Sequence, residues 1–194
     1  MRFRTAIFVA LGSMAAAGCF TVGTPFQVPQ VGERQLGRLT PNELLSSAGM
    51  NGARPNTTIV RGAKLQCYEF DAYKAGAGAM GKGLVGRSAE YCFADGVLVA
   101  YLVTSNISSE STDFDTAKAR SIEAGTSYAQ VIAALGQPAG AAISPIASVP
   151  DGIQLRYSFT GYSGILGKDV LKDARVELDG ARNVVSSRAE ERLL

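Results

Sequence analysis

Residues 125–138, GTSYAQVIAALGQP, predict a short capped helix. Ser127 and Gln130 match the capping box, in which each side chain satisfies a backbone N–H of the first turn. Gly136 ends the helix and Pro138 prevents its continuation. The apolar stripe between these signals would face a core, and it consists of Val131, Ile132, Ala134 and Leu135.

The same pattern occurs about 87 residues earlier, in LTPNELLSSAGMNG at 39–52. Thr40 and Glu43 form its capping box, and Gly49 ends it. Aligning the two boxes superimposes Gly49 on Gly136 without a gap. The agreement continues into strand patterns, which pair 64–70 with 153–159, 89–96 with 174–180, and 97–104 with 183–190. The chain therefore contains two copies of one unit.

A glycine-rich stretch in the first copy, KAGAGAMGKGLVGRS at 74–88, is similar to a nucleotide phosphate loop. Gly83 stands where such a loop needs Ser or Thr for Mg²⁺. The equivalent Lys168 of the second copy is followed by Asp169, and neither copy opens a helix there. We therefore predict long hairpin loops and no nucleotide. Lys82 and Lys168 are candidate interaction residues in these loops, although solvated loop charges are the plainer interpretation.

The beginning of the chain, MRFRTAIFVALGSMAAAGC, predicts a signal peptide over 1–18. Arg2 and Arg4 precede a short apolar stretch, and small residues precede Cys19. This order resembles a bacterial lipobox, which implies that Cys19 becomes the first mature residue and carries lipid of the palmitate type. The alternative is an ordinary signal peptide with Cys19 incidental. The resemblance implies a lipid anchor in the outer membrane, facing the periplasm, with residues 19–38 as a tether.

Charge and composition exclude several functions. Removing Arg2 and Arg4 with the signal leaves 17 basic and 17 acidic residues, which is unlike a nucleic-acid-binding protein. The chain has no histidine, so imidazole catalysis and histidine-ligated metals are excluded. No nucleophile–base pair accompanies the carboxylates that we considered, Glu69, Asp71, Asp95 and Asp179. We expect no catalysis, cofactor or metal.

Cys67 and Cys92 form an even pair in a compartment that permits disulfides. Each lies opposite its aromatic neighbours in an alternating strand, so both thiols would share one outer face. We favour a disulfide, which would stabilise the fold by about 3 kcal/mol. Two free buried cysteines are the alternative.

A capped helix followed by an antiparallel meander resembles the SmpA/OmlA (BamE-like) lipoprotein family. The resemblance rests on residues 125–126, 130–131, 135–138 and Tyr157. It implies an α+β fold of two tandem modules, each with one or two short helices on a three- to four-stranded antiparallel sheet. We place these modules at 39–104 and 122–194, joined by 105–121 with a short helix.

Two tandem copies also resemble the architecture of the β-lactamase inhibitory proteins. We predict a non-catalytic envelope lipoprotein that acts as an interaction scaffold. The family resemblance implies envelope protein partners, including the β-barrel assembly machinery. The alternative is an inhibitor-like or ligand-binding module that uses the doubled concave sheet.

Overall fold

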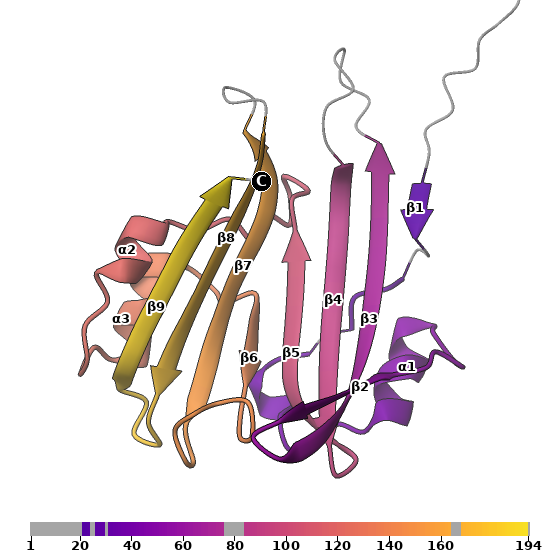
Figure 1. Cartoon of the computed structure of the whole chain (residues 1–194), viewed down its shortest axis with the longest axis horizontal. Coiled ribbons are helices and arrows are strands. Elements are labelled where there is room, and N and C mark those ends of the chain that lie inside the picture. Colours follow the sequence, from indigo (N-terminus) through magenta and orange to yellow (C-terminus); the bar gives the residue numbers. More distant parts are fainter. Residues whose placement is uncertain (1–20, 24–25, 30, 76–83, 164–167, 194) are drawn as a thin grey trace, which may run out of the picture.

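One antiparallel β-sheet dominates the structure, a computed structural model that describes residues 21–23, 26–29, 31–75, 84–163 and 168–193 (Figure 1). Its strand order is β1-β3-β4-β5-β6-β7-β8-β9, and β2 also pairs with β3. The strands are β1 Thr21–Gly23, β2 Asn56–Val60, β3 Ala63–Ala75, β4 Leu84–Ala94, β5 Val97–Ser105, β6 Gly140–Ala142, β7 Ile153–Ser163, β8 Lys168–Leu178 and β9 Val184–Leu193.

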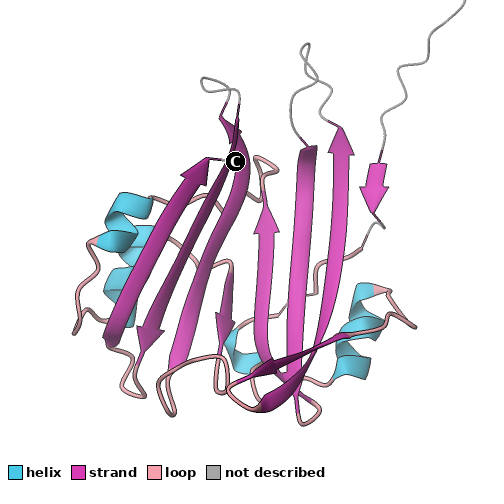
Figure 2. Ribbon diagram, viewed as in Figure 1, coloured by secondary structure: helices cyan, strands magenta, loops and turns pink. Residues whose placement is uncertain are grey.

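The helices of the described residues are short (Figure 2). They are α1 Pro41–Ala48, α2 Thr116–Arg120 and α3 Tyr128–Leu135, with a 3₁₀ turn at Glu33–Gln35. Both predicted capping boxes are confirmed, because the backbone N–H of Thr40 donates to Glu43 and that of Ser127 donates to Gln130, each at 2.9 Å. None of these helices is long and apolar enough to cross a membrane.

The prediction of two separate α+β modules is wrong. Strand β6 pairs with β5 on one side and with β7 on the other, so the strands of both halves form a single sheet. The sequence Gly140-Ala141-Ala142 has no side chain larger than a methyl group, which allows the two neighbouring strands to approach closely. The fold is therefore mostly β, and its helices are accessory elements.

The helices and the chain before α1 cover one side of this sheet. Leu44 of α1 and Val131 of α3 are fully buried against strand residues of the same cluster. The strands contribute alternate residues to this side. These residues include Tyr68, Phe70, Tyr91, Phe93, Tyr101, Leu155, Tyr157, Val176 and Leu178, so a single core runs beneath both halves.

Residues 26–29 and 31–39, most of which we expected in a tether, lie on the core side of the sheet. Phe26 is buried and packs on Phe70 at 5.6 Å between ring centroids. The N–H of Leu98 donates to the carbonyl of Leu39 at 2.8 Å. Glu33 pairs with Arg182 at 2.6 Å, which ties this segment to the second half of the chain.

We expect the Gly140→Ala substitution to destabilise the protein by about 3 kcal/mol. A Cβ atom at this position would overlap the backbone carbonyl of Tyr101, so β5 and β6 would have to separate. Urea denaturation followed by circular dichroism measures the effect.

Gly32→Ala is the matched control, because its Cβ would meet only the side-chain oxygen of Gln35, at 3.6 Å. Equal stability of the two variants would show that the junction between the halves tolerates a wider spacing.

Candidate functional site

The side of the sheet away from the helices, here called the open face, is crossed by a row of charged side chains. The row follows from the pairing register, because residues directly opposite one another point to the same side. In order across the sheet it consists of Glu69, Glu90, Leu102, Gly140, Arg156, Arg175 and Arg188.

Like charges lie side by side at both ends of this row. Glu69 is directly opposite Glu90 on β3 and β4. Arg175 is directly opposite Arg156 on one side and Arg188 on the other. Like charges in directly opposed positions destabilise a sheet. The opposed like charges therefore lower the stability of the free protein, so stability does not explain why these residues occupy the row.

One ion pair crosses the middle of the row. The guanidinium of Arg156 on β7 reaches Glu90 on β4 at 3.3 Å. Leu102 and Gly140 lie between them, and the missing side chain of Gly140 leaves a path along the sheet. Both charged groups are partly shielded, with 18% and 34% of their side chains exposed. This pair fixes the position of Arg156 across the junction of the two halves.

Arg175 and Arg188 are different, because both are exposed and neither makes an ion pair within the described residues. Their guanidinium groups keep all their donors for an external partner. Glu69 is likewise exposed and forms no ion pair in that part of the chain. This row of the open face thus presents unpaired positive charge on β8 and β9 and unpaired negative charge on β3, and the acidic Asp173 and Glu190 lie in the next row of β8 and β9.

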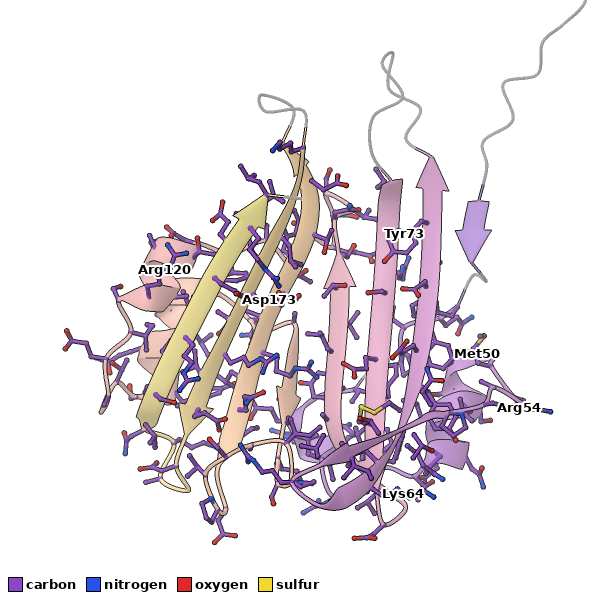
Figure 3. The ribbon with its side chains drawn as sticks, viewed as in Figure 1. Met50, Arg54, Lys64, Tyr73, Arg120 and Asp173 are labelled. Carbon is purple, nitrogen blue, oxygen red and sulfur yellow. A yellow bond between two sulfur atoms is a disulfide. The ribbon has the colours of Figure 1, made fainter. Side chains whose placement is uncertain are left out.

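The neighbouring rows contain acidic and hydrogen-bonded groups. Next to the arginines, Asp173 on β8 is directly opposite Glu190 on β9, and Glu190 pairs with Arg192 at 3.3 Å. On one side Ser88 and Thr104 share a hydrogen bond of 2.7 Å. On the other side the amide of Gln154 donates to Glu177 at 2.7 Å, and the N–H of Ser148 donates to the same carboxylate. Buried Glu177 is therefore a structural residue. Tyr73 and Asp173 lie on this face in opposite halves of the sheet (Figure 3).

One end of the open face is closed by a second apolar cluster around the Cys67–Cys92 disulfide (Figure 3). The two cysteines are directly opposite one another on β3 and β4 and are buried. Arg61, in the turn between β2 and β3, donates to the carbonyl of Ala147 at 2.6 Å. This contact joins the β2–β3 hairpin to the loop before β7 at the disulfide end of the open face.

The other sequence-predicted residues lie at scattered places. Lys168 is exposed at the first position of β8, while Lys82 and Cys19 fall outside the described residues. Asp95 adopts a positive φ of 50° in the β4–β5 turn, as an Asp-Gly hairpin requires. The carboxylate of Asp179 accepts the N–H of Asn183 at 2.9 Å, which is also a turn role.

A metal would find few donors in the described residues. Cys67, Cys92 and Glu90 are the group in this part of the chain whose ligand atoms lie close enough to share an ion. Because the two sulfur atoms are bonded to each other, only the carboxylate of Glu90 keeps its capacity as a ligand, and Arg156 engages it.

The arginine row was missed at the sequence level. Side chains alternate along RYSF (156–159) and RVEL (175–178), so Arg156 points to the other side of the sheet from Tyr157, and Arg175 to the other side from Val176. The sequence therefore indicates the side of the sheet on which each arginine lies. Their alignment across three strands depends on register, which the sequence does not display.

No family model and no curated protein matches this chain. A solved structure of a protein proposed to be a β-lactamase inhibitor protein, from Streptococcus mutans, is similar at 10% sequence identity with a TM-score of 0.43. The similarity covers 78% of this chain and 82% of that chain. A similarity with so low an identity and TM-score does not indicate the function of this chain. The resemblance to the SmpA/OmlA family finds no support in these comparisons and stays a prediction.

We expect reduction of the Cys67–Cys92 disulfide to lower the free energy of unfolding by about 3 kcal/mol, because the bond closes a loop across a sequence separation of 25. Urea denaturation with and without reductant measures the change. The Cys67→Ala/Cys92→Ala double variant is the control, and its stability should not respond to reductant. Identical midpoints for the native protein under both conditions would contradict the expectation.

Proposed function

We propose that this protein is a non-catalytic protein-binding module and that the open face of its sheet is the contact surface. The observation that carries the proposal is the row of opposed like charges, above all exposed Arg175 beside exposed Arg188. Opposed like charges cost stability in the free protein, and Arg175 and Arg188, which make no ion pair within the described residues, can be neutralised by acidic groups of a partner. Binding sites commonly retain arrangements of this kind, where function opposes stability.

The charges define the chemistry of the partner. Arginine binds carboxylates in a bidentate geometry, so an acidic segment of a partner would lie over β8 and β9. A basic group of the same partner would lie over Glu69 on β3.

The surroundings of this module are also part of the proposal. The signal pattern and Cys19 support a lipid-anchored protein of the bacterial envelope, at the outer membrane and facing the periplasm. The family resemblance seen in the sequence makes the β-barrel assembly machinery the partner to test first. An enzyme that presents an acidic loop is the alternative, in which case the protein is an inhibitor.

We expect the Arg175→Glu/Arg188→Glu variant to bind its partner at least about tenfold more weakly, because two desolvated charge pairs would become repulsive. The measurement is crosslinking and pull-down from gently solubilised membranes with a C-terminal tag, quantified by mass spectrometry. Recovery of assembly-machinery components in fixed proportion would support the scaffold, and a single soluble enzyme would support the inhibitor.

The matched control is Arg38→Glu/Lys118→Glu, which makes the same change in net charge at exposed positions away from the open face. Equal loss of partners in both variants would overturn the assignment of the surface. The single variant Arg175→Gln should bind less and unfold slightly less readily, by a few tenths of a kcal/mol, since it removes an opposed like charge. A purely structural arginine would lower stability when replaced.

We expect Cys19→Ala to abolish incorporation of radiolabelled palmitate and to release the protein from the membrane fraction. Acyl chains contribute about 0.8 kcal/mol per buried CH₂ group, and no described helix replaces that anchor. Cell fractionation of the two proteins tests this. If the Cys19→Ala variant stays attached to the membrane, the protein is not a lipoprotein anchored at Cys19. That result would not affect the proposal that the open face binds a protein.

A further inference from the structure

A cleft of about 710 Å³ lies on the opposite side of the sheet from the open face. One wall comes from the chain before α1, and the others come from β5, from α3 and the turn after it, and from the turn before β9. The volume is within the range of small-molecule sites. Its apolar lining comes from both halves of the chain and includes Val28, Val31, Val103, Pro138 and Ala139.

Several contacts connect the elements that line the cleft. Glu33 accepts from the hydroxyl of Tyr128 at 2.9 Å and from Arg182 at 2.6 Å. The Arg182 guanidinium also lies 5.2 Å from the centre of the Tyr128 ring. Thr112, at another part of the lining, donates to the carbonyl of Ser158 at 2.7 Å. Each of these polar groups already has a partner within the protein. The Glu33 carboxylate in particular is neutralised by Arg182, so it is not a binding group for a cationic ligand.

The hydroxyl of Tyr101 is different from these groups. Tyr101 lines the cleft from β5 and is more than nine-tenths buried, yet its hydroxyl makes no hydrogen bond to any described residue. Burial, with smaller contributions from Glu33 and Tyr128, raises the pKa of Tyr101 to about 12. The group therefore keeps its proton at neutral pH and offers a donor to an occupant. The hydroxyl oxygen is not fully enclosed by protein, so it can donate to an acceptor placed in the cleft.

The charge of the cleft selects among acceptors. Arg182 is neutralised by Glu33, whereas exposed Arg34 lines the cleft and makes no ion pair within the described residues. The balance at the cleft is therefore positive. Apolar walls, a hydroxyl donor that opens on the cleft and one cation without an ion pair among the described residues together fit an apolar chain that ends in a carboxylate.

We propose that this cleft binds a small apolar carboxylate of the alkanoate class, with Tyr101 donating a hydrogen bond to it. The site is separate from the protein-binding surface, since Tyr101 and the open-face row lie on opposite sides of the sheet. Either proposal can fail while the other stands.

The test uses decanoate as the probe, with isothermal titration calorimetry and NMR of the full mature chain. Wild type should show saturable binding that perturbs resonances of the cleft residues. Tyr101→Phe should bind at least about fivefold more weakly, because it removes only the hydroxyl. Arg34→Gln, an exposed change that does not threaten folding, should also weaken binding.

Tyr91→Phe is the matched control. Tyr91 is paired with Tyr101 in the sheet, and its hydroxyl is also without a partner among the described residues, but it is enclosed and does not line the cleft. This variant should bind decanoate like wild type. Absence of saturable binding to wild type, or equal affinity of wild type and Tyr101→Phe, would overturn the proposal.

Discussion

Pairing of β6 with both β5 and β7 is the interaction on which the rest of the structure depends. Three residues connect the two halves by backbone hydrogen bonds, and the small side chains of Gly140 and its neighbours make the approach possible. Without this junction the Arg156–Glu90 contact would have no fixed geometry, and the row of charges would be two unrelated patches. The cleft on the other side needs it too, because its walls come from both halves.

The two sides of the sheet differ in how much apolar surface they bury and in how their charges are arranged. The helix side buries aromatic and aliphatic side chains in a single cluster and supplies most of the stability. The open side contributes little burial over its charged row and keeps opposed like charges. A sheet with one solvated face tolerates polar residues there, but it does not require them to repel one another. The division places stability on one side and recognition on the other.

Local features of the fold could be predicted from the sequence, and long-range features could not. The helix at Tyr128–Leu135 is determined by a cap at Ser127 and a stop at Gly136, all within one stretch of chain. The Asp95-Gly96 turn follows in the same way from adjacent residues. In contrast, Gly140–Ala142 has no periodicity, so nothing local marks it as the strand that merges the halves. The alignment of Arg156, Arg175 and Arg188 arises only from register, and the Tyr101 cleft only from how the preceding chain packs.

Strand β1 has a bearing on how the protein sits in a cell. It pairs with the far end of β3, with Thr21 opposite Lys74, so the chain joins the sheet two residues after Cys19. Two residues of extended chain span at most about 7 Å. A lipid on Cys19 would therefore hold this corner of the sheet at the bilayer surface. The connection would be too short to let the domain move far from the membrane or reorient freely. Partners would be met within a thin layer next to the membrane, in a nearly constant orientation, so that attachment itself would raise the rate of productive encounters.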